Sequence, residues 1–302
     1  MSRVRLATRA TFAVLGLLLL IVSGYAWATY QNFTAGVPHG ASVPALAAGE
    51  TDLDGSAQNI LIVGSDSRAG ATRAEQTALR TGHDNGTVNT DTMMILHLPP
   101  NGGKPSIISF PRDSWVGIPG HGKGKLNSAY GDGYYPAKGR HERDRTAQSD
   151  GIAMTLRTVS RLTGLHIDHY LQINLLGFYR ISEAIGGVTV CLKHAQNATT
   201  DRDRYGSGYS GIDLPRGVST IQGKQALAFV RQRHGLPHGD LDRIKRQQYF
   251  LGAAFGKIAS AGELLNPFKL HRLLYAVSSS LLTDPTLNLL SLARSFELLS
   301  SG

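Results

Sequence analysis

The sequence predicts an α/β or α+β domain, in which helices cover a sheet, behind a single N-terminal transmembrane helix. Two observations predict this architecture. Short apolar runs that end in glycine or polar residues alternate with longer segments whose apolar residues recur at helical spacing. One uncharged apolar stretch of about 20 residues precedes them, which is the length that crosses a bilayer as a helix. With 302 residues, the chain is long enough to bury a sizeable core.

The transmembrane helix is predicted over residues 10–30, which carry no charged side chain. Arg3, Arg5 and Arg9 precede this stretch, and Tyr25, Trp27 and Tyr30 stand at its far end. Positive charge marks the cytoplasmic side, so residues 1–9 are expected to be a cytoplasmic tail and the domain to be extracytoplasmic. The alternative is a cleaved signal peptide with a small-residue site at Ala26-Trp27-Ala28. Both alternatives export the domain.

The segments after the anchor follow in order. Residues 31–57 are rich in Ala, Gly and Pro and are predicted to be a linker. Strands are predicted at 59–63, 93–98, 106–110, 169–174 and 187–192. Helices are predicted at 151–162, 176–185, 223–230 and 243–258. The segment 264–299 is expected to be largely helical, with breaks at Pro267 and Pro285.

The formal net charge of +9 predicts acidic partners, such as nucleic acid, an anionic membrane or phosphorylated ligands. Export of the domain weakens the nucleic-acid explanation. The single cysteine, Cys191, excludes an internal disulfide and a zinc site built from several cysteines. We expect Cys191 to be a small buried apolar residue.

Two aspartates stand at the ends of predicted strands. Asp66 and Arg68 follow the strand at 59–63, and Asp91 opens the strand at 93–98. Ligands usually bind at such strand ends in open α/β sheets. If the strands bring Asp66 and Asp91 together, the two carboxylates and phosphate oxygens would make a magnesium site. The alternative for each aspartate is a turn residue or a strand cap.

A predicted turn presents a further arginine. Pro111 ends the strand at 106–110 and fixes the turn that presents Arg112. Lys125 and Asn127 follow after a loop that its glycines are expected to make pliable. The alternative for Arg112 is a surface ion pair with a nearby acid.

The richest basic cluster lies further along the chain. Arg231 and Arg233 are two residues apart, so they point the same way if the segment is extended. Arg243 and Gln247 are four apart, so they share one face of a helix. Guanidinium groups match phosphate oxygens, and several that converge suit a pyrophosphate. The alternative is a solvated basic helix in which Asp240 and Asp242 are the internal partners.

Taken in order, these clusters closely resemble the LytR-CpsA-Psr family of cell-wall glycopolymer ligases, in its actinobacterial form. The resemblance covers residues 58–260, which are expected to be the catalytic domain, with a C-terminal helical segment over 261–302 packed on it. The segments that carry it are Gly64-Ser65-Asp66-Ser67-Arg68, Asp91-Thr92-Met93-Met94, Phe110-Pro111-Arg112-Asp113, Lys125-Leu126-Asn127, Ile167-Asp168-His169-Tyr170, Gly186-Gly187-Val188, Arg231-Gln232-Arg233 and Asp240 through Gln248.

The resemblance implies an α/β/α sandwich with a central mixed sheet and a hydrophobic channel for a polyprenyl tail. It implies a membrane-bound phosphotransferase that moves a glycopolymer, arabinogalactan or a related one, from a polyprenyl-pyrophosphate carrier to peptidoglycan as a phosphodiester. It implies Mg²⁺, or Mn²⁺ in its place. No nucleic-acid partner is expected, because the domain is exported. Asp66 and Asp91 would hold the metal, and Asp91, Asp66 and Arg112 would take part in catalysis. The pyrophosphate contacts would be Arg68, Arg112, Lys125, Arg231, Arg233, Arg243 and Gln247.

The chain departs from the family pattern at two positions. Many relatives have an arginine where this chain has Asn89, so one phosphate contact is missing or comes from elsewhere. Actinobacterial relatives often carry a second cysteine near the position of Val218. This chain lacks that cysteine, so Cys191 cannot form the disulfide that the resemblance would imply. We also expect no extra C-terminal domain of the kind that some relatives carry.

Three other functions stay open at this point. A polyprenyl-pyrophosphate hydrolase would use the same residues with water as the acceptor. An envelope-related transcriptional attenuator would need a cytoplasmic domain, which a topology reporter tests. The third is a degenerate family member that acts only as a scaffold, and the retained arginines argue against it.

Overall fold

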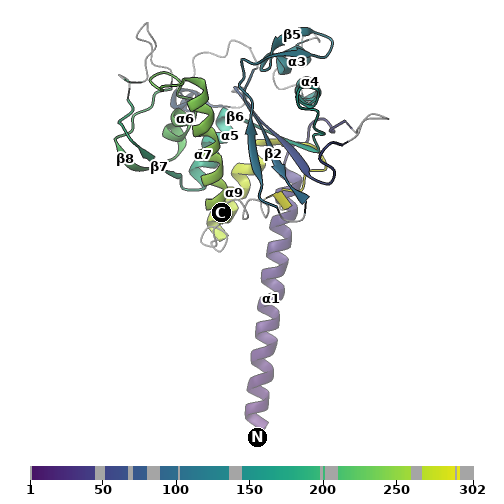
Figure 1. The fold of residues 1–302 in the computed structure, drawn as a ribbon. Coiled ribbons are helices and arrows are strands. Elements are labelled where there is room, and N and C mark those ends of the chain that lie inside the picture. Colours follow the sequence, from purple (N-terminus) through teal and green to yellow (C-terminus); the bar gives the residue numbers. More distant parts are fainter. Residues whose placement is uncertain are drawn as a thin grey trace.

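The described part of the chain is organised around a five-stranded mixed sheet (Figure 1). This computed structural model describes residues 2–44, 52–66, 71–79, 89–100, 103–135, 145–197, 200, 210–259, 267–289 and 291–292. The strand order is β3-β2-β1-β6-β9. β1 (Gln58–Ser65) lies antiparallel to β2 (Thr90–Leu98) and parallel to β6 (His169–Asn174). β3 (Ser106–Ser109) and β9 (Leu281–Thr283) add antiparallel at the two edges.

Side chains of the central strands alternate between two cores, as the two-residue period of a strand requires. On one face, Leu61 and Val63 of β1 pack in a core with α3 (Ser128–Tyr134) and α4 (Arg145–Thr163). On the other face, Ile60 and Ile62 pack in a core with Leu251 of α7 (Asp240–Ala259). Helices therefore cover both faces of a mixed sheet, which confirms the α/β/α sandwich.

A third core lies beside the sheet, around a hairpin of β7 (Val188–Leu192) and β8 (Gly217–Ile221). The helices that contribute to it are α5 (Leu175–Ala184), α6 (Gly223–Arg231), α7 and α9 (Pro267–Ser278). Leu79, at the end of α2 (Arg73–Ala78), is buried in the same core. Because Phe250 of α7 packs in this core and its neighbour Leu251 packs against the sheet, α7 lies between the two.

The predicted strands and helices of the domain are all present, and they differ from the prediction mainly at their ends. α4 begins at Arg145 and α7 at Asp240, before the residues at which their apolar periodicity starts. The first turn of a helix is often polar, because it carries the groups that cap it, so a hydrophobic pattern starts late.

The glycine-rich loop that was expected to be pliable forms a hairpin instead. β4 (Trp115–Ile118) pairs with β5 (Gly122–Lys125) in a register that runs from Trp115↔Lys125 to Ile118↔Gly122. Gly120 and Gly122 have φ angles of 78° and 76°, in the left-handed region that favours glycine. These glycines therefore shape a tight turn. Ile118, buried in the core with α3, holds the hairpin against the domain.

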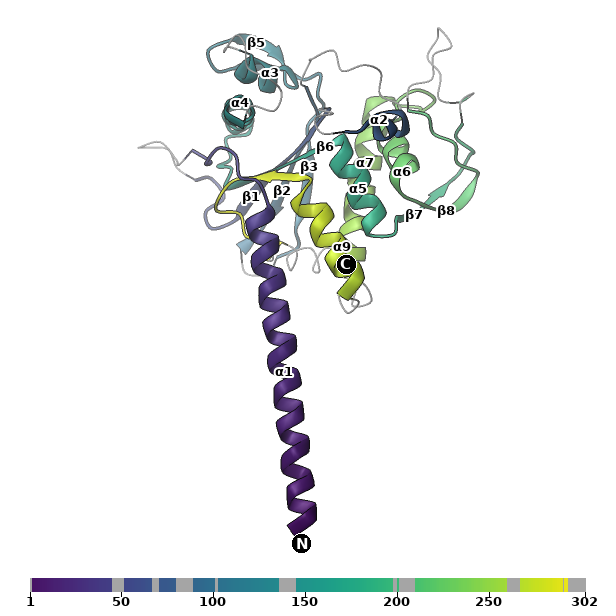
Figure 2. The ribbon, with the colours of Figure 1, turned by 180° about the vertical axis from the view of Figure 1, so that it is seen from behind.

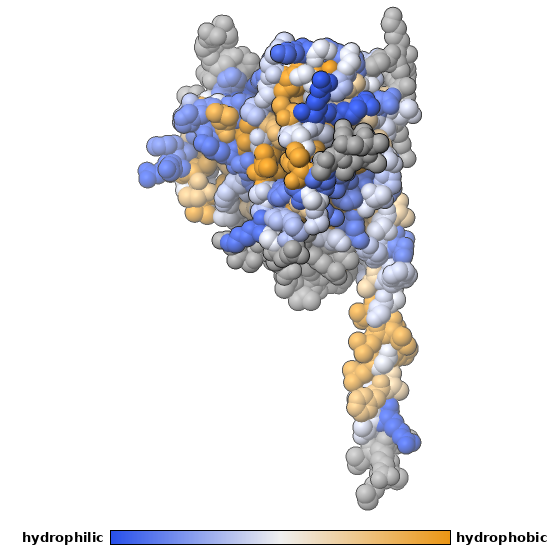
Figure 3. Space-filling model, turned by 45° about the vertical axis from the view of Figure 1, so that its right-hand side comes forward, coloured by the Kyte–Doolittle hydropathy of each residue, from blue (hydrophilic) through white to orange (hydrophobic). Residues whose placement is uncertain are grey.

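A long helix, α1 (Ser2–Gly36), projects from the domain (Figures 1 and 2). Within residues 8–36, the most apolar stretch of 18 residues has a mean hydropathy of 2.0. No residue of that stretch is buried against the domain. Figure 3 shows this apolar band on the helix. By length and composition α1 is a candidate membrane span, a test that an N-terminal signal sequence also passes.

The segment after α1 differs from the predicted linker over 31–57. α1 continues to Gly36, and the next residues pair with β9: Gly40 N donates to Thr283 O at 2.9 Å and Thr283 N donates to Pro38 O at 3.2 Å. Val37 is buried. α1 therefore joins the domain directly, because the residues that follow Gly36 already pair with β9. Composition does not reveal this contact, because backbone pairing with a strand edge requires no particular side chains.

The C-terminal region also differs from the expected helix with two breaks. Pro267 begins α9, where its missing N–H costs no hydrogen bond, and Leu281–Thr283 forms strand β9. A run as short as this one suits either a helix or a strand, and the open edge of β6 decides for the strand.

Cys191 lies on the outward face of β7 and is exposed, so the expectation of a buried residue was wrong. Its neighbours Val190 and Leu192 are the buried ones, because successive strand residues alternate between faces. Its register partner across the hairpin is Val218, which is also exposed.

Candidate functional site

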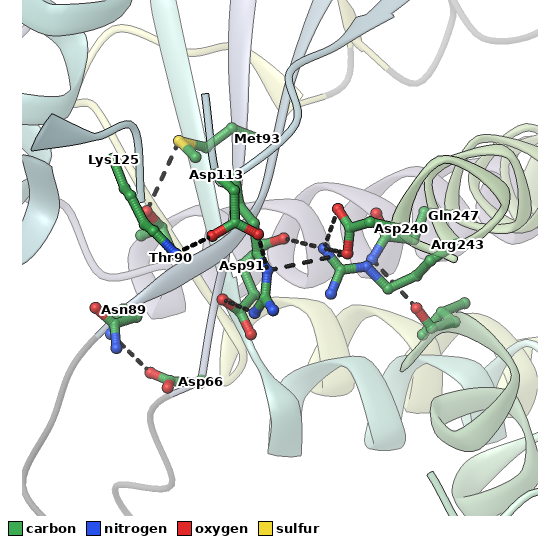
Figure 4. A network of polar contacts seen from close by, with 12 residues as sticks. Asp66, Asn89, Thr90, Asp91, Met93, Asp113, Lys125, Asp240, Arg243 and Gln247 are labelled. Carbon is green, nitrogen blue, oxygen red and sulfur yellow. Dashed lines mark hydrogen bonds and ion pairs between the residues drawn. The ribbon is translucent and has the colours of Figure 1, made fainter. Parts of the chain in front are cut away.

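The end of β1 and the start of β2 meet at one edge of the sheet. Their pairing shifts between Gly64↔Thr92 and Ser65↔Thr90. Beyond this bulge, Asp66 N donates to Asn89 O at 3.1 Å, and Asn89 N donates to Asp66 Oδ1 at 2.8 Å (Figure 4). Both bonds use the backbone of Asn89. Asp66 is therefore held by contacts that an arginine at position 89 would also supply.

Arg112, in the turn after β3, points into a group of three aspartates. Its Nη1 lies 2.7 Å from Asp91 Oδ1, and its Nε lies 3.6 Å from Asp113 Oδ2 and 3.9 Å from Asp240 Oδ1. Burial alone would lower the pKa of Arg112, but the carboxylates, Asp91 first among them, offset this and raise it. Arg112 therefore stays charged, and its ion pair lies within the site.

Arg243 reaches the same place from the first turns of α7. Its Nη2 lies 2.9 Å from Asp240 Oδ1 and donates to the backbone oxygen of Asp91 at 3.2 Å (Figure 4). Burial lowers the pKa of Arg243, and the nearby charge of Arg112 acts in the same direction. A buried guanidinium beside another cation is stabilised when an anion binds.

The buried donors of these two arginines are not all used. Among the described residues, neither Arg112 Nε nor Arg243 Nε has a hydrogen-bond partner. Buried donors in native proteins are nearly always paired, so an unpaired one needs an explanation. Two such donors at one site indicate a place that a ligand rearranges.

Arg231 and Arg233 flank a buried glutamine at the end of α6. Gln232 is fully buried, and its Nε2 donates to Gln196 Oε1 at 2.7 Å and to His234 O at 3.0 Å. Its Oε1 accepts from Arg246 Nη1 at 2.5 Å. The backbone of Gln232 is extended, with φ −59° and ψ 131°. Its side chain therefore turns inward, while Arg231 and Arg233 both reach the cavity, as their spacing predicts.

These arginines and aspartates line one cavity of about 270 Å³. Its charged lining is Asp66, Asp91, Arg112, Arg231, Arg233 and Arg243, and its uncharged polar side chains are Ser65, Thr92, Asn174 and Gln247. Its apolar lining is Ile62, Met94, Ile173, Leu175, Phe178, Leu227, Val230, Phe250 and Leu251. Four arginines against two aspartates give the lining a formal charge of +2.

The two linings occupy different parts of the cavity. On α7, Phe250 and Leu251 follow Gln247 by about one turn and Arg243 by about two turns. On β2, Asp91 comes before Met94, whose register partner on β1 is Ile62. Polarity therefore falls from the strand ends toward the middle of the sheet. Such a cavity fits an anionic group that carries an apolar tail.

The structure brings together most of the site residues that the sequence predicts. Asp66, Asp91, Arg112, Arg231, Arg233, Arg243 and Gln247 line the cavity. Lys125 is not part of this lining; its Nζ lies 2.6 Å from Asp113 Oδ1, and its side chain is 56% exposed. Arg68 lies outside the described residues.

Sequence reasoning assigned no site role to Asp113 or Asp240, which hold Arg112 and Arg243. Asp240 was expected only as an internal partner of a basic helix, and its pair with Arg243 confirms that contact. The signal was present in the sequence, since Asp113 follows Arg112 directly and Asp240 stands three residues before Arg243. The apolar lining gave no such signal, because its residues look like ordinary core residues.

The carboxylates of the cavity fit a metal ion only if the substrate contributes ligands. Among the described residues, no three histidine, cysteine or acidic side chains come together as a metal site. Asp66 and Asp91 both line the polar end, and Asp91 is 40% exposed. Mg²⁺ is commonly bound by one or two carboxylates, waters and substrate phosphates, which suits this set of donors.

Comparisons with known proteins match residues 35–301 to the LytR_cpsA_psr family. The cell wall biosynthesis protein LcpA of Corynebacterium glutamicum is 34% identical over an alignment of 320 residues. The alignment covers 97% of this chain and 58% of that protein. The polyisoprenyl-teichoic acid–peptidoglycan teichoic acid transferase TagU of Oceanobacillus iheyensis is 35% identical over 216 residues, covering 70% of this chain and 56% of that protein. This chain therefore spans less than two thirds of the length of either relative.

Solved structures show the same fold. The LytR-Csp2A-Psr enzyme from Actinomyces oris superposes with a TM-score of 0.61 at 19% identity, over 88% of this chain and 82% of that one. At this level of identity the likeness extends to the fold alone.

Proposed function

Because this chain belongs to the LytR_cpsA_psr family, we propose that it transfers a glycopolymer from a polyprenyl-pyrophosphate carrier to peptidoglycan. The observation that carries the proposal is the cavity, which is cationic at one end and apolar at the other. A polyprenyl-pyrophosphate glycan has matching parts, because its pyrophosphate is anionic and its tail is a hydrocarbon. The names of LcpA and TagU support a role in cell wall assembly.

The proposed enzyme is held at the membrane by α1, with its domain outside the cytoplasm. The apolar length of α1 supports the anchoring. The positive charges before the apolar stretch support the orientation. An anchored domain meets a lipid-linked donor at the surface where that donor lies.

In this proposal the arginines of the polar end bind the pyrophosphate. Each phosphate of a pyrophosphate diester carries one negative charge, which matches the formal charge of +2 on the lining. Arg231 and Arg233 approach from the end of α6, while Arg243 and Gln247 approach from α7. The planar guanidinium forks hold two phosphate oxygens each, which fixes the direction of the bond to be broken. The tail then lies against Phe250 and Leu251.

The reaction exchanges one bond at phosphorus for another. The hydroxyl oxygen of a peptidoglycan sugar attacks the phosphorus that bears the glycopolymer and forms the new P–O bond. The P–O bond to the polyprenyl phosphate breaks, and that phosphate leaves with the electron pair. Asp91 receives the hydroxyl proton, and Arg112 with its neighbours compensates the charge that develops on the leaving group.

Asp66 and Asp91 would hold Mg²⁺ together with phosphate oxygens of the substrate. When bound, the ion would add positive charge next to the leaving phosphate. Arg68, which stands two residues after Asp66, is proposed as a further phosphate contact. Lys125 is proposed to act only indirectly, because it binds Asp113, which in turn lies beside Arg112.

Arg231→Ala tests the proposal in the full chain, purified in detergent. Two quantities are measured: polyprenyl phosphates that copurify, and glycan phosphate joined to peptidoglycan. The variant should lose both, whereas Arg272→Ala, an exposed arginine on α9, should keep both. Transfer at the wild-type rate by folded Arg231→Ala rejects the assignment. Release of polyprenyl phosphate in the absence of an acceptor would instead indicate a hydrolase, and a cytoplasmic topology reporter signal would favour a regulator.

A further inference from the structure

The outward face of the β4–β5 hairpin has an unusual composition for a surface of two short strands. Trp115 is 68% exposed there, while its neighbours Val116 and Ile118 are buried. The residue on the same face two positions along β4 is Gly117, and nothing lies within 4 Å of the place that a Cβ would occupy. This face therefore carries an exposed indole and, two residues along the strand, backbone with open space above it.

Two lysines complete this face. Residues directly opposite each other in an antiparallel pair point to the same side, and Trp115 is opposite Lys125 while Gly117 is opposite Lys123. Both lysines are exposed. Single exposed aromatic residues are common and need no explanation. An exposed indole next to bare backbone and two cations is a more specific combination.

The hairpin is joined firmly to the polar end of the cavity. Trp115 follows Arg112 by three residues, and Asp113 lies between Arg112 (3.6 Å) and Lys125 (2.6 Å). Backbone bonds close the base of the hairpin: Leu126 N donates to Ser114 O at 2.8 Å, and Asn127 N donates to Arg112 O at 3.1 Å. A ligand on this face would therefore be held at a fixed position relative to Arg112.

The position of the hairpin in the molecule distinguishes it from the lipid-binding part. β5 and α3 lie at the end of the domain away from α1 in both views (Figures 1 and 2). With α1 in the membrane, this end faces the cell wall. The apolar lining, in contrast, extends from the polar end toward the middle of the sheet. The two substrates would then reach the phosphorus from different sides.

We propose that the outward face of the β4–β5 hairpin binds the peptidoglycan acceptor strand, with a sugar ring on the Trp115 indole and a carboxylate near Lys123. The proposal rests on the proposed function, because it names the acceptor surface of that reaction. The C–H groups of a sugar face carry partial positive charge and suit the negative face of an aromatic ring. The carboxylates of muramyl peptides suit an exposed lysine.

Cosedimentation of the full chain, in detergent micelles, with purified peptidoglycan sacculi tests this surface. Trp115→Ala should weaken binding about tenfold and raise the KM for the acceptor, while Trp115→Phe keeps most of the affinity. Tyr275→Ala is the matched control, since Tyr275 is 69% exposed on α9 near the membrane end. Lys123→Ala should weaken binding to strands that carry peptide stems but not to strands freed of them.

The proposal is overturned if Trp115→Ala sediments like the wild type, or if Tyr275→Ala loses as much binding. This result is separable from failure of the proposed function. Sedimentation requires no transfer, and donor binding is measured independently by the copurified polyprenyl phosphate, which Trp115→Ala should retain.

Discussion

Asp91 and Arg112 form an ion pair, 2.7 Å between Oδ1 and Nη1, at the polar end of the cavity. Arg112 also lies near Asp113 and Asp240, but neither of these lines the cavity. Asp91 is therefore the one carboxylate of the three that both contacts Arg112 and lines the cavity. When substrate binds, Arg112 can exchange Asp91 for a phosphate oxygen and still be held by the other two carboxylates.

The first prediction concerns the proton-accepting role of Asp91. Asp91→Asn keeps the shape of the side chain and removes its charge. Transfer should fall about 100-fold or more, as for loss of a general base. Binding of polyprenyl pyrophosphate, measured in the presence of a chelator, should stay the same or become tighter, because a negative charge leaves a cationic site. A loss of binding as large as the loss of rate would contradict this role.

The second prediction treats Gln232 as a positioning residue. Gln232→Leu removes the buried hydrogen bonds that Gln232 makes with Arg246, Gln196 and the His234 carbonyl, which should lower the free energy of unfolding by about 2 kcal/mol. The Kd for polyprenyl pyrophosphate should rise about tenfold, because Arg231 and Arg233 lose their common support. The same change at Gln222, the exposed residue before α6, is the control and should alter neither quantity. Loss of stability with unchanged donor affinity would make Gln232 structural only.

The third prediction concerns the apolar end of the cavity. Leu251→Trp puts a larger side chain into the space that the tail would occupy. Transfer from a full-length polyprenyl donor should fall about tenfold, while a short-chain donor should remain a substrate. Leu241→Trp, at a 54% exposed position on the same helix, is the control. Equal losses with both donors would place the tail elsewhere.

The fourth prediction concerns pH and a buried carboxylate near the anchor. Asp284 is fully buried, and it accepts hydrogen bonds from Thr286 Oγ1 at 2.6 Å and Tyr170 N at 3.1 Å, with His169 Nδ1 also 3.1 Å away. Burial would raise the pKa of Asp284, but these contacts, the His169 ring first, offset it and lower the pKa from 3.8 to about 2.

A carboxylate whose pKa is lower in the folded state stabilises the fold above its unfolded pKa and loses that contribution as the pH falls to the folded value. The wild type should therefore lose about 2 kcal/mol of unfolding free energy between pH 3.8 and about 2 that Asp284→Asn does not lose. Denaturant titrations at several pH values measure the difference. Parallel pH profiles for the two proteins would show that Asp284 contributes no such stability.

The fifth prediction uses the register of the β7–β8 hairpin. Cys191 and Val218 are direct cross-strand partners, so Val218→Cys should form a disulfide after oxidation. The bond should stabilise the domain by about 3 kcal/mol relative to the reduced protein. Thr220→Cys is the control, because Thr220 is opposite Thr189 instead. Two titratable thiols in oxidised Val218→Cys would show that the pair cannot be bridged.

Much of the fold was predictable because it depends on local periodicity. The apolar run that became β1, and the helical spacing that became α5 and α7, are properties of neighbouring residues. Short elements whose formation depends on distant segments could not be predicted. β9 exists because β6 has an open edge, and the β4–β5 hairpin exists because Ile118 finds a core that α3 completes.

The sequence by itself determined which charged residues stand at the ends of strands and helices. Asp66 and Asp91 stand at strand ends, and Arg231 and Arg233 alternate around one residue, whatever the rest of the chain does. Only the tertiary structure decided that Arg243 contacts the backbone of Asp91, that Gln232 is buried, and that Lys125 turns to Asp113. The reason is physical: spacing sets the direction of a side chain relative to its own backbone, whereas its partner is set by packing between segments distant in the chain.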